Sequence, residues 1–403
     1  MARMGAGIRP GLEITKELLG LLGNPQAGLR CLHVAGTNGK GSTCRFSHRL
    51  LSQAGLETGL FTSPHMVCVR ERFVIGEEAI SEGEFAVLLE RVLPISERIG
   101  ATYFETLTAV GALWFRDRGV QALVLETGLG GRLDSTTAFP AEVCAVTQVG
   151  LDHTQILGDT VEKIWREKIA ILRPGKPLVT CQTRTDLLDE LGMLARERGG
   201  RAVLLDPNDK FRLDGVPAGR MQEENLQVAV RSVELFLGRK LDRSAIEASL
   251  RGMRWPARFE GVPGDPETIL DVGHNPDAAV ELAALCEPIR PVLLFGAMSD
   301  KNWREVLRTL SPTCSAIHLA PLDTARAEDP FRIAKEFPEA DAHPTYDAAW
   351  EAARNQARLK GIPLLVAGSF HTVGQAARRL WADGHYRFWP DGIVPDPLLP
   401  GMG

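Results

Sequence analysis

The stretch that decides the fold is "HVAGTNGKGSTC", residues 33–44, in which a glycine-rich turn follows an apolar run. Residues 29–35 predict a short buried strand, and the periodicity of residues 40–54 predicts a helix. Glycines between a strand and a helix let the backbone wrap closely around an anion. The helix N-terminus adds free N–H groups and a partial positive charge. The stretch therefore favours a phosphate cradle.

Lys40 adds a formal positive charge to this cradle, and Ser42 or Thr43 is placed to reach a magnesium ion. A strict P-loop would have glycine where this chain has Val34, and serine or threonine where it has Gly41. An ordinary glycine-rich turn between a strand and a helix is therefore the alternative interpretation. The local chemistry favours nucleotide binding.

Length and composition place the chain among ordinary globular proteins. It has 403 residues, which predicts two or three domains, with 44% apolar and 24% charged residues. The net charge of −5 gives no reason to expect a nucleic-acid surface, and no apolar run approaches the ~18 residues that span a bilayer. Seven cysteines without a C-x-x-C pair indicate reduced thiols, each a small buried hydrophobe, in a cytoplasmic protein.

Apolar runs alternate with helical patterns along most of the chain, which predicts an α/β fold with largely parallel sheets. The expected strands include 120–125, 143–149, 178–181, 268–271, 292–295, 316–320 and 364–367. A segment rich in proline and glycine, 251–267, separates two parts. We expect a P-loop-type ATPase domain at 1–252, a linker at 253–263 and a smaller Rossmann-like α/β domain at 264–403. A cleft between the domains is the expected ligand site.

Polar residues follow several of the predicted strands. Glu126 ends one strand, His153 follows a second, and Ser63 follows a third. Ligands of open α/β sheets bind beyond the carboxyl ends of the strands, so these three residues are expected to converge near Lys40. A helix cap, a solvated loop residue or a structural histidine is the alternative for each one taken singly. Together they favour a metal–nucleotide site.

Lys168 is the least expected residue of the sequence. The segment 158–172 predicts a helix capped by Asp159, and Lys168 falls on its apolar stripe with Ile164 and Trp165. A lysine at such a position either extends its amine to solvent or is partly buried. In the second case desolvation lowers the pKa of its amine.

The second domain repeats one layout, in which polar residues stand between a strand and a helix. Asp271, His274 and Asn275 occupy one such junction, and Ser369 with His371 occupies another. Helix capping is the alternative interpretation for these side chains. Arg258 in the linker is either a surface charge or a group that reaches phosphates.

The segments taken together resemble the Mur ligase superfamily, and within it the dihydrofolate synthase/folylpolyglutamate synthase family. The resemblance runs in family order from about residue 10 to 375. Its segments are "GLEITKELLGLLGNPQ", "HVAGTNGKGSTC", "FTSPHMVCVRERF", "LETGLGGRLDSTTAF", "GLDHTQILGDTVEKIWREKIAI", "AGRMQEENLQVAV", "WPARFE", "DVGHNP" and "GSFHTV".

The resemblance implies roles for individual residues. ATP would lie on Gly36, Thr37, Asn38, Gly39, Lys40, Gly41 and Ser42, with Asn225, Arg258 and Asp271 as further ATP-binding residues. Magnesium would bind at two sites through Ser63, Glu126, His153 and a carboxylated Lys168. The expected substrate residues are Asp134, Arg72, His274 and Ser369, and the expected catalytic residues are Lys40, Lys168 and His274.

The implied reaction joins L-glutamate to dihydropteroate or to a reduced folate, in a monomeric cytoplasmic enzyme that uses ATP and Mg²⁺. Two departures from the family pattern stand out. Thr137 replaces an asparagine, and Met221 with Gln222 replaces a His-Gln pair ahead of Asn225. The alternatives are another amino-acid ligase of the superfamily and a nucleotide-binding regulatory protein without a ligase step.

Overall fold

The computed structural model of the chain describes residues 11–206, 219–254, 256–391 and 393–394. The described residues divide into two compact units. The first takes in the chain up to Pro64 together with Arg70–Gly252, and the second takes in His65–Val69 and the chain from Met253. Residues 65–69 were predicted in the N-terminal domain, so their membership of the second unit is a correction. No helix in the described ranges is long and apolar enough to cross a membrane.

The first unit is built on a mostly parallel sheet in the order β4-β3-β2-β5-β1-β6-β7-β8. Only the β2–β3 and β3–β4 pairings among its described strands are antiparallel. Its strands are β1 (Cys31–Ala35), β2 (Thr58–Phe61), β3 (Phe73–Ile75), β4 (Glu78–Ala79), β5 (Ala122–Glu126), β6 (Ala141–Val146), β7 (Pro177–Thr180) and β8 (Arg201–Leu204).

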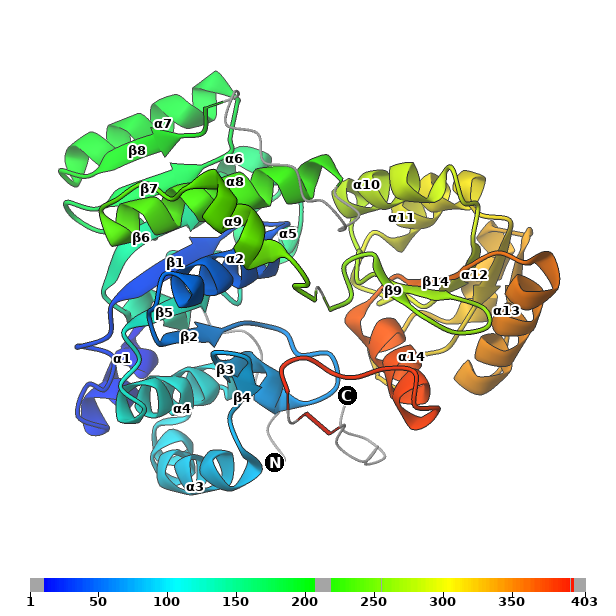
Figure 1. The fold of residues 1–403 in the computed structure, drawn as a ribbon, viewed down its shortest axis with the longest axis horizontal. Coiled ribbons are helices and arrows are strands. Elements are labelled where there is room, and N and C mark those ends of the chain that lie inside the picture. Colours follow the sequence, from blue (N-terminus) through cyan, green and yellow to red (C-terminus); the bar gives the residue numbers. More distant parts are fainter. Residues whose placement is uncertain (1–10, 207–218, 255, 392, 395–403) are drawn as a thin grey trace. The chain divides into compact units, whose positions relative to one another are not determined.

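Helices complete the first unit, and α2 packs against α8 on one face of its sheet (Figure 1). The helices are α1 (Glu13–Leu21), α2 (Lys40–Gln53), α3 (Glu82–Ile99), α4 (Tyr103–Asp117), α5 (Thr154–Leu157), α6 (Val161–Ile169), α7 (Thr185–Glu197), α8 (Arg220–Leu237) and α9 (Arg243–Leu250). Short 3-10 helices are η1 (Val69–Arg72) and η2 (Ser135–Ala138).

The second unit carries its own sheet in the order β13-β12-β11-β14-β10-β9. Its strands are β9 (Glu260–Val262), β10 (Thr268–Leu270), β11 (Val292–Phe295), β12 (Ala316–Leu319), β13 (Ala340–Ala342) and β14 (Leu364–Ala367). Its helices are α10 (Pro276–Cys286), α11 (Trp303–Leu310), η3 (Ser311–Thr313), α12 (Pro330–Glu336), α13 (Tyr346–Lys360) and α14 (Phe370–Ala382).

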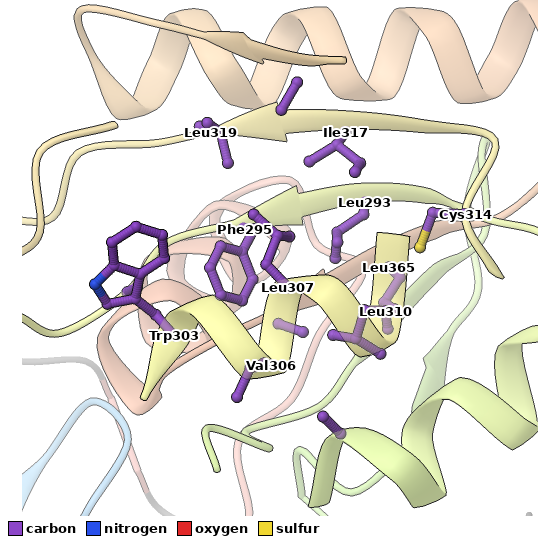
Figure 2. Packing of buried hydrophobic residues seen from close by; sticks show 14 of the residues in the cluster. Leu293, Phe295, Trp303, Val306, Leu307, Leu310, Cys314, Ile317, Leu319 and Leu365 are labelled. Atoms are coloured by element: carbon purple, nitrogen blue, oxygen red, sulfur yellow. The ribbon is translucent and has the colours of Figure 1, made fainter. Parts of the chain in front are cut away.

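The core of the second unit forms where α11 covers the sheet. Trp303 and Leu307 of this helix are buried against Phe295 of β11 in one apolar cluster (Figure 2). The strands there are apolar along their whole length because both faces of a parallel sheet are covered. This packing confirms the predicted α/β class for the C-terminal part of the chain.

Three local predictions need correction. The predicted linker 253–263 includes β9, which pairs antiparallel with β10, so its end belongs to the second sheet. The predicted strand 143–149 ends at Val146, because the backbone beyond it bonds to the glycine-rich loop. Helix α6 is capped by the Thr160 side chain and not by Asp159, which pairs with Lys163 at 2.7 Å instead.

Candidate functional site

The glycine-rich loop leaves β1 in the middle of the first sheet and enters α2. All five residues of β1 are buried between β5 and β6, which fixes where the loop begins. Gly39 is the N-cap of α2 with φ 83°, a left-handed conformation that favours glycine. It offers no capping side chain, so the helix starts with backbone N–H groups and its partial positive charge. The predicted cradle therefore has the geometry that anion binding needs.

Lys40 folds back over this loop. Its Nζ donates to the carbonyl oxygens of Gly36 at 3.1 Å and Thr37 at 3.2 Å. Ser42, one turn into α2, is buried at 3% exposure. The Lys40 ammonium, bonded to the loop backbone, adds a full positive charge to the partial positive charge at the N-terminus of α2.

Asn225 comes from α8 to the same loop and is 1% exposed. A side-chain carbon built on Gly39 would lie 2.0 Å from Asn225 Oδ1, so the amide fills the space that the glycine leaves open. The Asn225 Nδ2 donates to Gln222 at 3.1 Å, and Thr43 of α2 donates to the Asn225 carbonyl at 3.3 Å. Gln222, which keeps the glutamine of the family's His-Gln pair, thus orients the asparagine.

Lys168 is buried on α6, at 4% exposure. Its Nζ donates to the Gly36 carbonyl at 2.7 Å, so the amine points into the glycine-rich loop and does not extend to solvent. Burial, with repulsion from Lys40 as the second cause, lowers the pKa of the Lys168 amine from 10.5 to about 7. The predicted buried amine is therefore present, and part of it is neutral at neutral pH.

Glu126 and Ser63 lie together at the carboxyl ends of β5 and β2. The Ser63 backbone N–H donates to Glu126 Oε2 at 3.1 Å, and Glu126 is 4% exposed. His153 begins α5 in a left-handed conformation with φ 50°, and its side chain lies 3.8 Å from Asp152. The described residues contain no group of three or more histidines, cysteines, aspartates or glutamates that could hold a metal.

Asp134 is buried and its carboxylate is used within its own loop. Its oxygens accept from the Leu129 N–H at 2.8 Å and from the Thr136 hydroxyl at 2.6 Å, and burial raises the pKa of the carboxyl. The Thr136 hydroxyl also contacts His33 of β1 at 2.8 Å. Arg72, also buried, lies over the Tyr103 ring at 5.7 Å. The structure thus gives Asp134 a loop-shaping contact, whereas its predicted substrate contact stays a prediction.

Within the second unit, Arg258 stands between two residues with left-handed backbones, Ala257 at φ 52° and Phe259 at φ 51°. Non-glycine residues rarely adopt this conformation, and it is typical of functional positions. Asp271 holds the turn by accepting from the Phe259 N–H at 2.8 Å and the Gly273 N–H at 2.7 Å. The arginine lies 5.7 Å above the Phe370 ring.

Some polar residues at the strand ends of this unit cap helices, and others remain candidate site residues. Ser369 caps α14 and Asn275 caps α10 through their side chains, as the capping alternative predicted. His274 bonds to the Val272 carbonyl at 2.9 Å and its ring lies 6.3 Å from Phe370. Phe370 is therefore a neighbour of two of the predicted site residues, Arg258 and His274. The sequence did not single it out, because an aromatic residue after a strand has no distinctive pattern.

The sequence of the second unit identifies the class of protein. A profile described as the Mur ligase glutamate ligase domain matches residues 257–370. A glycine-rich loop on one mostly parallel sheet and this domain on another are typical of a Mur ligase-type protein. The dihydrofolate synthase/folylpolyglutamate synthase of Bacillus subtilis is 30% identical over 422 residues, covering 94% of this chain and 96% of that protein. The chain belongs to the dihydrofolate synthase/folylpolyglutamate synthase family.

Two further comparisons agree with this family. A structure of the Escherichia coli FolC protein in complex with DHPP and ADP superposes with a TM-score of 0.84 at 29% identity, covering 94% of this chain and 95% of that one. A probable bifunctional folylpolyglutamate synthase/dihydropteroate synthase of Haloferax volcanii is 35% identical over 93% of this chain. The chain spans about half the length of that relative, 49%. The predicted family and two-part α/β fold are confirmed.

Proposed function

We propose that this chain is an ATP-dependent ligase that joins L-glutamate to dihydropteroate and to folate (poly)glutamates. The main observation in support of this proposal is that the buried Lys168 amine donates to the Gly36 carbonyl of the phosphate loop. Strongly shifted pKa values cluster at functional sites, and burial lowers the pKa of this amine to about 7. The names of the family's members and the ADP and DHPP bound to the E. coli FolC protein support the substrate class.

The proposed reaction passes through an acyl phosphate. The terminal phosphoryl group of ATP moves to a carboxylate oxygen of the acceptor, and ADP leaves. The glutamate amine then attacks the acyl carbon, an amide bond forms, and phosphate leaves with the proton released from the amine. Lys40, which bonds to the loop, and the start of α2 would stabilise charge on the phosphoryl oxygens.

Lys168 is the residue that we propose to be carboxylated. Its neutral amine would add carbon dioxide, losing one proton and forming a carbamate whose single negative charge is shared by two oxygens. Glu126, Ser63 and His153 would join this carbamate in holding magnesium, whose bound charge would polarise the phosphoryl oxygens. Carboxylate and hydroxyl oxygens are ligands that a hard cation prefers, and Glu126 and Ser63 are neighbours, since the Ser63 N–H donates to Glu126 at 3.1 Å.

The remaining site residues stay predictions. They are Asn38, Gly41, Ser42, Asn225, Arg258 and Asp271 for ATP, and Asp134, Arg72, His274 and Ser369 for the acceptor and glutamate. A monomeric state and a cytoplasmic location are likewise part of the proposal.

One experiment tests the function. The purified protein is incubated with ATP, Mg²⁺, glutamate and either dihydropteroate or tetrahydrofolate, and the product masses are measured. We expect both acceptors to gain a glutamate residue, because "TSPHMVCVRERF" and "GSFHTV" resemble the bifunctional form. Turnover of a muramyl precursor alone would place the chain in another branch of the superfamily. Phosphate release that does not depend on glutamate would indicate a regulatory ATPase.

The phosphate loop itself is tested by Gly39→Ala. The new side chain would face a strained φ of 83° and the Asn225 Oδ1 at 2.0 Å, so the loop or the asparagine has to move. We expect ADP to bind at least about tenfold more weakly, as measured by calorimetry.

Gly20→Ala is the matched control for this substitution. Gly20 lies in α1 with nothing within 4 Å of an added side-chain carbon, so alanine fits there and favours the helix. ADP affinity should be unchanged in that variant. Unchanged affinity in a correctly folded Gly39→Ala protein would refute the close fit between the loop and Asn225.

A further inference from the structure

Thr37 has its polar groups engaged with protein, although the sequence assigned it to ATP. Its hydroxyl donates to the Gly150 carbonyl at 3.1 Å and accepts from the Gly150 N–H at 3.2 Å. Its backbone N–H donates to the Gln148 carbonyl at 2.8 Å. Its own carbonyl accepts from Lys40 at 3.2 Å. A hydroxyl that both donates to and accepts from one residue fixes the distance between two chain segments.

Thr147 makes the corresponding contact in the opposite direction, from the segment after β6 to the glycine-rich loop. It follows β6, and its hydroxyl donates to the Asn38 carbonyl at 2.6 Å, with the Ala35 carbonyl at 3.3 Å. The side chain is 1% exposed, and its Oγ1 lies 1.8 Å from where a side-chain carbon on Gly36 would be. The glycine-rich loop and the segment after β6 thus each have one threonine side chain bonded to the backbone of the other. We call Thr37 and Thr147 the threonine clasp.

The clasp joins the phosphate loop to a segment that leads directly to another part of the site. Gly150 is three residues before His153 in the chain. The Asp152 carboxylate accepts from the neighbouring His153 N–H at 2.8 Å. A shift of the phosphate loop would therefore pass through Thr37 and Gly150 to the backbone that carries His153. The branched threonine side chain has few rotamers, which makes the connection stiff.

We propose that the threonine clasp is a positioning device, which couples nucleotide binding at the phosphate loop to the conformation of residues 150–153. Thr37 and Thr147 act through backbone and not by contacting the reacting atoms. The inference rests on the proposed function in one respect, namely that the loop binds a nucleotide. It gives a task to Thr147, which has no predicted role, and a further task to Thr37, which the family resemblance assigns to ATP.

Hydrogen exchange of backbone amides gives a direct test, because the Gly150 N–H is bonded to the Thr37 hydroxyl. ADP is the probe, added to the full chain of the wild type, Thr37→Val and Thr37→Ser. In the wild type ADP should slow exchange in the peptide that covers residues 150–153. In Thr37→Val this slowing should disappear and ADP should bind about tenfold more weakly, since two hydrogen bonds are lost. Thr37→Ser keeps the hydroxyl and should restore the slowing.

Thr108→Val is the matched control. The Thr108 hydroxyl, buried at 1% exposure in α4, also bonds to a backbone carbonyl, that of Phe104 at 2.8 Å. This variant should keep both ADP affinity and the slowing at 150–153. The proposal is wrong if Thr37→Val retains the ADP-dependent slowing, or if Thr108→Val loses it equally. Binding of ADP to the wild type without slowing at 150–153 overturns the coupling alone, whereas absence of ADP binding overturns the proposed function as well.

Discussion

Lys40→Ala should abolish glutamate ligation while the protein stays folded. The Lys40 amine closes the phosphate loop through the Gly36 and Thr37 carbonyls, so it is held where the terminal phosphoryl group would lie. Its removal takes away a full positive charge from the point where negative charge develops. Losing one such preorganised donor typically costs about 10²–10³ in rate. Glutamate-dependent phosphate release measures the loss, and thermal unfolding checks the fold.

Lys16→Ala serves as the control, because Lys16 is an exposed lysine on α1 of the same unit. Its rate should equal that of the wild type. The loop's own structure should survive the Lys40 substitution, since the Thr37 N–H still donates to the Gln148 carbonyl at 2.8 Å. Near-normal turnover in folded Lys40→Ala would rule out the phosphate cradle as the site of the reaction.

Lys168→Ala should lose most of the activity, and a short added carboxylic acid should restore part of it. The substitution removes the proposed carbamate, and a free carboxylate likewise offers magnesium two oxygens that share one negative charge. Lys168→Met keeps much of the buried volume, which separates loss of the amine from a packing defect. Lys163→Ala, on the same helix but with its side chain 56% exposed and paired with Asp159, should stay fully active.

The pH dependence gives a second measurement for the same residue. The pKa of the Lys168 amine is about 7, so the neutral form that adds carbon dioxide declines as the pH falls below that value. Activity under limiting carbon dioxide should therefore fall from pH 8 to pH 6 and recover when bicarbonate is added. The Lys168→Ala variant rescued by a carboxylic acid should not respond to bicarbonate. An unmodified Lys168 in a crystal structure with ATP and magnesium bound would refute the carbamate.

Much of the site was predictable because the signals are local. The apolar run of β1, the glycines after it and the periodicity of α2 lie within one short stretch, residues 31–53. The helical phase of Ile164, Trp165 and Lys168 likewise placed a lysine on a buried face, and all three are buried in α6. The apolar run of residues 120–125 predicted that Glu126 ends a strand, and β5 does end at Glu126.

The misplaced elements have a different cause, which is competition between hydrogen-bond partners. Residues 147–149 directly continue an apolar run and were predicted to extend its strand, yet the Gln148 carbonyl and the Thr147 hydroxyl bond to the glycine-rich loop. Asp159 and Thr160 are both good helix caps, and the aspartate pairs with Lys163 while the threonine caps α6. In each case the local sequence contains more than one possible hydrogen-bonding arrangement, and it does not show which one forms.

The sequence by itself therefore determined the α/β class, the family, the glycine-rich loop between β1 and α2 and the apolar surroundings of Lys168, because periodicity and short spacings encode them. Tertiary structure alone decided that the Lys168 amine meets the Gly36 carbonyl at 2.7 Å, across 132 residues of sequence. It also decided that Thr37 bonds to Gly150, 113 residues away, and that residues 65–69 belong to the second unit. Such contacts depend on how strands distant in the chain align in one sheet, which no local pattern specifies.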